Sequence, residues 1–424
     1  LVTGVQTCAL PICAGHTATL LYNGKVLLAG GWNSSGPLAS AELYDPVTGV
    51  FTSTGNMTVA RASHSATLLP DGRVLIAGGN TGNADSSYPS FTGDIYDPST
   101  GTFTATGSMV YSRYVSSSLS TMLGNGKVLV AGTEPAQLYD PVTGTFSMAG
   151  PFAGDAYIYS CSQTLTLLQD GRVLFTGWAD CVGDYTPLVL LYEPKTNSFN
   201  PTGKVTNTNT ATLLPNGKVL MVGSDAELYD PSTGVVAGIG KAMEPHWRAF
   251  TATLLSNGQV LIAGGELEGG GSDTGAELYD AETGTFRSAG NMTVGRSDHT
   301  ATLLRDGTVL MAGGRGSGIS AEIYRPATAP AAPSVKIVDN NTGSLTTLAV
   351  GDSVSFLVNG AAPRSEVTIS QPGWSASLGY TDASGMFTLN GIVAPTVVGT
   401  WNQTWSVGGV VAQPNPLTFS ITAK

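Results

Sequence analysis

The sequence has few charged residues, no cluster of Lys and Arg, and no long apolar run. Only 12% of its 424 residues are charged, and 19 basic residues against 30 acidic ones give a net charge of −11. Proteins that bind nucleic acid usually carry basic clusters, so nucleic acid is not expected as a partner. No run of about 18 apolar residues occurs, which excludes a transmembrane helix. Long amphipathic helical patterns are also missing, so we do not expect a helical fold.

Glycine is abundant and apolar residues are sufficient for a core. The chain has 55 Gly and 42% hydrophobic residues, and the glycines lack the period of three that is typical of collagen. Many Gly, Ser, Thr and Asn between short apolar stretches favour short strands joined by turns.

A stretch of the form T-A-T-L-L-x-x-G-x-V-L-x-A-G-G recurs seven times. Its turn glycines lie 41 to 54 residues apart, at Gly24, Gly72, Gly126, Gly171, Gly217, Gly258 and Gly307. Each copy predicts a strand, a tight Asn-Gly or Asp-Gly type of turn, and a second strand.

A second signature follows in each copy, where a Tyr ends an apolar strand. In most copies a Phe follows seven residues later, after a turn of the form D-P-x-T-G-T. The tyrosines are Tyr44, Tyr96, Tyr139, Tyr192, Tyr229, Tyr279 and Tyr324. Each copy therefore predicts four short strands, which is one blade of a β-propeller.

The Gly-Gly doublets together with the spaced Tyr and Phe resemble the kelch repeat. The resemblance covers residues 16–326 and departs from the family in having Phe where kelch repeats usually have Trp. It implies an all-β fold with a seven-bladed propeller, which we place at residues 14–326.

The N-terminal segment reads VTGVQTCALPI from Val2 to Ile12 and resembles the translation of a DNA-sequencing adapter. We therefore treat residues 1–13 as an artefact and expect the native start, with any signal peptide, to be missing. In kelch propellers an N-terminal strand commonly completes the last blade. The chain makes no fourth strand after Tyr324, so we expect the seventh blade to lack its outer strand and to expose an edge.

The C-terminal part follows a Pro/Ala-rich linker at residues 327–333. Seven alternating stretches between residues 334 and 424 predict an immunoglobulin-like β-sandwich.

Cys161 and Cys181 flank the predicted hairpin of the fourth copy. Antiparallel pairing about its turn would bring them opposite each other, so a disulfide is geometrically feasible, and two free thiols are the alternative. A disulfide would fit a secreted or cell-surface protein.

The loops after the second strand of each copy vary in length, which is typical of recognition loops on a constant frame. The connections between blades share that face. They carry a set of candidate binding residues that we place at the mouth of the central channel: Arg61, Arg113, Tyr114, Trp247, Arg248, Arg296, His64 and His299. The arginines could hold an anionic ligand. Alternatively, they could pair inside the ring with the acidic residues two positions before the tyrosines, which are Glu42, Asp94, Glu227, Glu277 and Glu322.

A kelch propeller followed by a sandwich is similar to the galactose oxidase architecture. That resemblance implies copper bound by two Tyr and two His, with one His from the C-terminal domain and one Tyr cross-linked to a Cys. Tyr114 and His299 could match two ligands. However, Asp298 stands where a Tyr is expected, no His follows His299, and the second copy has no Cys. We therefore expect no copper and no catalytic residues.

Two other metal interpretations are also disfavoured. The acidic loop with Glu266, Glu268 and Asp273 could bind calcium, although a solvated loop is the favoured alternative. His16, His64 and His299 recur at one repeat position without the spacing of metal ligands, which favours a structural role.

These observations predict a non-catalytic, exported, bacterial-type monomer that binds a protein or a glycan through its variable-loop face. One alternative is an enzyme that acts on a sugar at the arginine-lined channel, similar to galactose oxidase or, by fold alone, to a sialic-acid mutarotase. Another is a structural surface module. The environment of the arginines discriminates among them.

Overall fold

The computed structural model describes residues 2–7, 14–82, 90–110, 119–132, 136–150, 163–178, 187–203, 208–223, 225–240, 242 and 248–326, together with the strands between residues 334 and 422. All regular elements among these residues are strands, so none of them belongs to a helix that could cross a membrane. The chain divides into two compact units, one of Leu1–Leu303 with Val309–Tyr324 and the other of Leu304–Thr308 with Arg325–Lys424.

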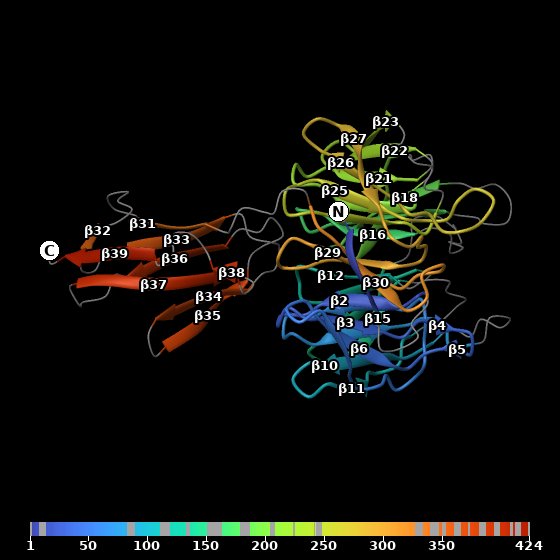
Figure 1. The fold of residues 1–424 in the computed structure, drawn as a ribbon, viewed down its shortest axis with the longest axis horizontal. Coiled ribbons are helices and arrows are strands. Elements are labelled where there is room, and N and C mark those ends of the chain that lie inside the picture. The colour runs from blue at the N-terminus through green and yellow to red at the C-terminus, as the bar shows by residue number, and fades with distance from the viewer. Residues whose placement is uncertain are drawn as a thin grey trace. The chain divides into compact units, whose positions relative to one another are not determined.

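The first unit is a seven-bladed propeller of antiparallel four-stranded sheets (Figure 1), as the repeats predict. Blade 1 has β2 (Thr17–Leu20), β3 (Val26–Ala29), β6 (Ala41–Asp45) and β7 (Val50–Ser53). Blade 2 has β8 (Ser65–Leu68), β9 (Val74–Ala77), β10 (Gly93–Asp97) and β11 (Thr102–Ala105). Blade 3 has β12 (Leu119–Met122), β13 (Val128–Ala131), β14 (Gln137–Asp140) and β15 (Thr145–Met148). Blade 4 has β16 (Thr164–Leu167), β17 (Val173–Trp178), β18 (Pro187–Glu193) and β19 (Ser198–Pro201).

The remaining blades follow the same order. Blade 5 has β20 (Thr210–Leu213), β21 (Val219–Val222), β22 (Ala226–Asp230) and β23 (Val235–Gly240). Blade 6 has β24 (Thr251–Leu254), β25 (Val260–Ala263), β26 (Gly275–Asp280) and β27 (Thr285–Asn291). Blade 7 has β28 (Thr300–Leu303), β29 (Val309–Ala312), β30 (Ser320–Tyr324) and β1 (Val2–Thr7). A short hairpin of β4 (Trp32–Asn33) and β5 (Gly36–Pro37) decorates the loop of blade 1.

The spacing of Tyr and Phe follows from the turn between the third and fourth strands. Tyr44 lies directly opposite Phe51 in the strand register, and their ring centroids are 4.7 Å apart. The turn is closed by Asp45, whose side chain accepts a hydrogen bond from Val47 N at 2.9 Å, and by Gly49 in the left-handed region at φ 70°. The same ring pair, at 4.7 to 4.9 Å, recurs in four further blades.

The seventh blade is closed, which corrects the expectation that it lacks its outer strand. β1 pairs antiparallel with β30, with Val2 opposite Tyr324 and Thr7 opposite Ser320. An antiparallel ladder uses backbone N–H and C=O groups. An extended segment that reaches the free edge of β30 can therefore complete the sheet whatever its side chains are. Residues 8–13 lie outside the described residues.

The core lies between neighbouring blades rather than within each one. Leu27 and Ala29 of β3 pack with Val74, Ile76 and Tyr96 of the next blade in one buried cluster. The innermost strands also contact one another in turn around the ring, from β2 and β8 to β28 and back to β2. Each blade therefore buries its apolar faces only when both neighbours are present.

Three histidines connect blades through hydrogen bonds at the inner strands. His64 Nε2 lies 2.9 Å from Thr17 Oγ1 of blade 1, and His16 Nε2 lies 3.0 Å from Thr300 Oγ1 of blade 7. His299 Nε2 lies 3.1 Å from Thr251 Oγ1 of blade 6. We call these three bonds, which join blades 6, 7, 1 and 2 in sequence, the histidine belt.

No such bond joins blades 3 and 4 among the described residues. Gln163 occupies the position of the histidines, and Leu119 occupies the position of the threonine that should face it. Gln163 is 7% exposed, and neither its Oε1 nor its Nε2 has a hydrogen-bond partner in the described structure. A buried amide without partners destabilises a protein by about 1–3 kcal/mol.

Leu119→Thr is expected to be more stable than Leu119→Val, because only the threonine brings a hydroxyl toward Gln163. The two variants remove nearly the same volume, so their difference isolates the hydrogen bond. We expect a gain of about 1 kcal/mol in the free energy of unfolding, measured by urea denaturation. Equal stability of the two variants would show that Leu119 does not face the amide.

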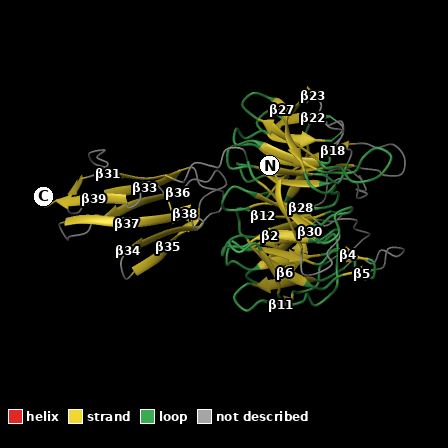
Figure 2. Cartoon of the chain, in the orientation of Figure 1, coloured by secondary structure: helices red, strands yellow, loops and turns green. Residues whose placement is uncertain are grey.

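The described residues of the second unit form nine strands in two sheets (Figure 2). One sheet has β31 (Ser334–Asp339), β33 (Ser353–Asn359) and β36 (Phe387–Val393). The other has β32 (Thr347–Ala349), β34 (Glu366–Gln371), β35 (Trp374–Tyr380), β37 (Gly399–Val407), β38 (Val410–Val411) and β39 (Leu417–Thr422). Seven of these strands coincide with the alternating stretches of the sequence, while the short β32 and β38 were not predicted. Linker residues 327–333 lie outside the described residues.

Candidate functional site

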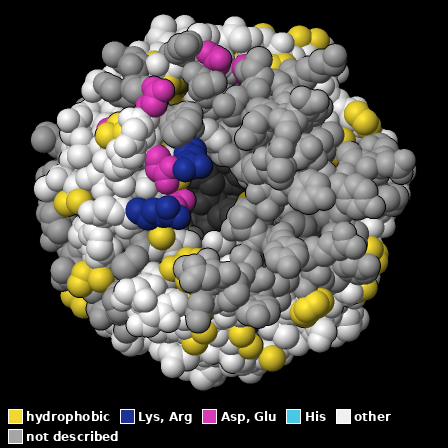
Figure 3. Space-filling view, turned by 90° about the vertical axis from the view of Figure 1, so that its right-hand side faces the viewer, with side chains coloured by type: hydrophobic (Ala, Val, Ile, Leu, Met, Phe, Trp, Pro, Cys, Tyr) yellow, Lys and Arg dark blue, Asp and Glu magenta, His cyan; other side chains and the backbone are white. Residues whose placement is uncertain are grey.

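The variable loops and the blade connections lie on one face of the propeller. The connection that leads into blade 2 is hydrogen-bonded to the loop of blade 1, with Arg61 N donating to Leu38 O at 3.0 Å and Met57 N to Ala39 O at 2.8 Å. The connection into blade 7 contacts the loop of blade 6 in the same way, with Arg296 N donating to Asp273 O at 3.0 Å. Figure 3 shows this face, with the opening of the channel at its centre.

Arg61 is buried and does not reach the channel mouth, where the sequence placed it. Its side chain is 0% exposed, and Nη2 pairs with Asp94 Oδ2 at 3.0 Å. Nη1 donates to Gly78 O at 2.8 Å and to Thr92 O at 2.7 Å. The guanidinium therefore holds the glycine doublet and the third strand of its own blade together.

Arg296 has the same environment in blade 7. It is 0% exposed, and Nη2 pairs with Glu322 Oε1 at 2.8 Å. Nη1 donates to Gly313 O at 2.9 Å and to Ser320 O at 2.7 Å. Burial opposes ionisation of Glu322, but hydrogen bonds from Thr293 and Arg296 outweigh it and lower the pKa of this carboxyl. The anion-binding interpretation is therefore wrong for Arg61 and Arg296, because their charges are already paired out of solvent.

Several other predicted site residues lie outside the described residues. These are Arg113, Tyr114, Trp247, Cys161 and Cys181. The described part of blade 3 has no carboxylate two positions before the third-strand Tyr that could pair with an arginine. Gln137 stands at that position and accepts a hydrogen bond from Val110 N at 2.7 Å.

His64 and His299 are buried among the blades, 4% and 6% exposed. Burial lowers the pKa of each imidazole to about 3, so both rings are neutral near pH 7. The His64 ring lies against the doublet of blade 1, where a Cβ on Gly30 would approach its Cε1 to 2.7 Å. These two predicted site residues therefore belong to the histidine belt and not to an exposed surface.

Arg248 differs from the buried arginines because it occupies another repeat position. Arg61 and Arg296 stand three residues before His64 and His299, whereas Arg248 stands two residues before the equivalent Phe250. Its side chain is 63% exposed, and its Nε donates to the Glu266 carboxylate.

Arg248 is one of four charged residues that ion pairs join on the loop face, with Glu266, Asp298 and Arg315, and we call these four the rim cluster. Arg315 Nε lies 2.9 Å from Asp298 Oδ2, and Arg315 Nη1 lies 3.8 Å from Glu266 Oε1. Burial raises the pKa of the Asp298 carboxyl, and the Arg315 charge opposes this shift. Basic and acidic side chains gather beside the central opening in Figure 3.

A repeated backbone bridge positions the rim side chains. In blades 1, 2 and 7, the residue that directly follows the Gly-Gly doublet pairs with a residue of the blade connection. That connection residue stands two positions before the histidine at the start of the first strand. Bridges join Trp32 with Ala14, Asn80 with Ala62 and Arg315 with Ser297. In blade 6 the corresponding Glu266 N donates to Arg248 O at 2.8 Å. The frame is therefore constant, and the side chains that it presents differ from blade to blade.

In each connection, the residue that follows the bridged one adopts a left-handed backbone conformation. Its φ is 65° at Gly15, 53° at Ser63, 58° at Ala249 and 54° at Asp298. This conformation is uncommon for residues other than glycine. Its recurrence in four blades shows that it is a feature of the frame and not peculiar to Asp298.

The sequence analysis did not identify Arg315 and considered Glu266 only as a calcium ligand. The available signal was positional, because both residues directly follow a Gly-Gly doublet. Glu266 forms ion pairs with two arginines, and Asp273 Oδ1 accepts from Gly275 N at 2.9 Å. The Glu266 carboxylate is therefore paired with arginines of a blade connection and of blade 7, and the Asp273 carboxylate accepts a hydrogen bond within its own loop.

Two positions that the copper resemblance points to have other partners in the described structure. His299 uses Nε2 for Thr251, and Asp298, which stands where the resemblance expects a Tyr, is paired with Arg315. Within the described ranges, no three His, Cys, Asp or Glu side chains are grouped so that they could hold a metal.

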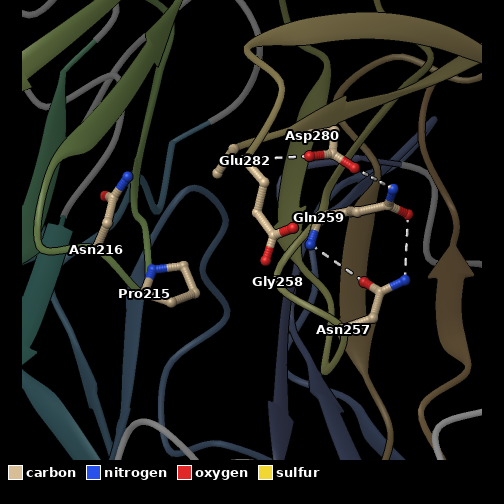
Figure 4. A pocket seen from close by; sticks show the side chains of 8 residues that line it. Pro215, Asn216, Asn257, Gly258, Gln259, Asp280 and Glu282 are labelled. Atoms are coloured by element: carbon tan, nitrogen blue, oxygen red, sulfur yellow. Dashed lines mark hydrogen bonds between the residues drawn. The ribbon is translucent and has the colours of Figure 1, made fainter.

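A recess lies among the turns between blades 5 and 6 (Figure 4), with a volume of about 280 Å³. Gln259 Nε2 donates to Asp280 Oδ2 at 2.9 Å there. Blades 1, 3 and 5 instead have a lysine–aspartate pair at this place, at 3.2 to 3.7 Å. Asp280 also accepts from Glu282 N at 2.9 Å, so its carboxylate serves the turn itself.

Residues 14–58 match the Kelch motif family. No curated protein matches the chain. Among solved structures, it is similar to a novel fungal alcohol oxidase with catalytic diversity among the AA5 family, in complex with copper. The identity is 17% and the TM-score 0.64, over 100% of this chain and 99% of that one, which shows a shared fold. Residues 14–58 therefore carry a kelch motif, and the chain is built as a seven-bladed β-propeller with a second unit, a fold that it shares with this oxidase.

Proposed function

We propose that this chain is a non-catalytic binding module that recognises a protein or a glycan through its variable-loop face. The observation that carries the proposal is the rim cluster. Arg248 and Arg315 are 63% and 67% exposed on the loop face and are oriented by Glu266 and Asp298. Charged groups held in place by neighbours lose little freedom when a ligand binds.

The contrast with the buried arginines supports this function. Arg61 and Arg296 stabilise the frame at a repeated position, whereas Arg248 and Arg315 use positions where the repeat sets no residue type. Exposed side chains that vary on a constant frame are typical of recognition surfaces.

We propose that the module is exported and monomeric, with a Cys161–Cys181 disulfide and without copper or another cofactor. The C-terminal unit would then be an immunoglobulin-like sandwich that presents the propeller.

Arg315→Ala is expected to weaken ligand binding by about tenfold or more, because one charge-assisted hydrogen bond contributes about 1.5–3 kcal/mol. A glycan array and a pull-down with the full chain would identify the ligand, and the variant would be compared on the same ligand. Arg287→Ala is the matched control, since Arg287 is an exposed arginine of β27 whose described contact is with Gln259. Unchanged binding by Arg315→Ala, or turnover of a sugar with no binding partner, would contradict the proposal.

A further inference from the structure

We propose that the rim binds an acidic saccharide, with the carboxylate of a uronic-acid residue at Arg248 and Arg315. This inference rests on the proposed function and specifies its ligand.

The rim cluster presents its positive charges outward. The two arginine side chains are 63% and 67% exposed, whereas those of Glu266 and Asp298 are 18% and 36% exposed. A ligand that approaches from solvent therefore meets guanidinium groups first, with the carboxylates behind them. Guanidinium groups match the geometry of carboxylates, to which they can donate two parallel hydrogen bonds.

Glu266 also fixes the spacing of the two arginines. Its Oε2 accepts from Arg248 Nε, and its Oε1 lies 3.8 Å from Arg315 Nη1. One carboxylate thus bridges both guanidinium groups from the protein side. A ligand carboxylate of the same shape can approach both groups from the solvent side.

The rim positions of the neighbouring blades favour a sugar as the carrier of that carboxylate. The residue after the doublet is Glu266 in blade 6, Arg315 in blade 7, Trp32 in blade 1 and Asn80 in blade 2. Trp32 is partly exposed and lies against Gly15, where a Cβ would be 3.1 Å from its Cδ1. An aromatic ring offers a flat apolar surface for the face of a pyranose, while amide and carboxylate groups suit hydroxyls.

The net negative charge of the chain disfavours nonspecific, long-range attraction of anions. The chain carries a net charge of −11, so its long-range field repels anions. Salt screens that field beyond about 8 Å at physiological ionic strength. Binding must therefore come from contacts at the rim, and a simple inorganic anion, which has no flat apolar face to lie against Trp32, is a poor match.

The test compares oligogalacturonate with the same oligosaccharide after reduction of its carboxyl groups, titrated calorimetrically into the full chain. We expect the acidic form to bind at least about tenfold more tightly, as one charge-assisted contact implies. Arg315→Gln should remove that preference, whereas Arg287→Gln should retain it. Trp32→Ala should weaken both forms, because it removes the surface for the sugar ring and no charge.

The outcomes separate this inference from the proposed function. Equal binding of the acidic and reduced forms would overturn the acidic ligand but support a glycan-binding module. Capture of a protein that depends on Arg315, with no binding to oligogalacturonate, would also overturn the inference alone. Equal competition by inorganic sulfate would reduce the site to a general anion site and overturn the saccharide. No rim-dependent ligand of any class would overturn both.

Discussion

Replacing Arg296 with leucine is expected to lower the free energy of unfolding by about 3–5 kcal/mol. The substitution leaves the Glu322 carboxylate buried without its cation, and it removes the donors to Gly313 O and Ser320 O. Because these contacts join the connection, the doublet and the third strand, the whole of blade 7 loosens. Urea denaturation followed by circular dichroism measures the loss.

Two comparisons make this prediction specific. The double variant Arg296→Met with Glu322→Leu should recover much of the loss, because no unpaired charge then remains in the interior. Arg73→Leu breaks an exposed pair with Asp71, whose side chain is 46% exposed, and should change stability by less than about 1 kcal/mol. If Arg296→Leu were no more harmful than Arg73→Leu, the buried pair would not support the blade.

Acidification is expected to destabilise the propeller well before its carboxylates are protonated. Burial lowers the pKa of His16 to about 4 and those of His64 and His299 to about 3, from the ordinary 6.5. The unfolded chain therefore binds more protons than the folded one between pH 6.5 and about 4. Stability is complete above pH 6.5 and falls as the pH drops, by about 1.4 kcal/mol per pH unit for each histidine.

Thermal unfolding measured at intervals from pH 7 to 4.5 would show this loss. His64→Gln is the matched variant, since Gln163 occupies the same repeat position in blade 4. It should reduce the slope of stability against pH by about a third, because one of three titrating groups is removed. An unchanged slope would show that His64 is not buried in its neutral form.

The sequence predicts the blades well because their signals are local. The turn glycines require a left-handed backbone, as at Gly24 with φ 82°, and the Tyr–Phe spacing fits one turn between two strands. Such requirements involve residues close in the chain, so they recur visibly. The strands of the C-terminal unit were found from their alternation for the same reason.

The environment of each arginine could not be predicted in that way. Arg61 and Arg248 both lie in blade connections, but a shift of one position relative to the first strand moves the side chain from the interior to the rim. The closure by β1 was missed because residues 1–13 were set aside as an artefact, whereas strand pairing uses the backbone whatever the side chains are. Arg315 was missed because its partners lie in the loop of blade 6 and in the preceding connection.

The histidine belt and the rim residues occupy the same four blades. Bonds from His299, His16 and His64 join blades 6, 7, 1 and 2, and these blades carry Glu266, Arg315, Trp32 and Asn80. Relative movement of these blades would require breaking buried hydrogen bonds, so their rim keeps one geometry before a ligand arrives. At the rim of these four blades, the dissociation rate constant would then determine the affinity for a ligand, because association requires no slow rearrangement of the protein.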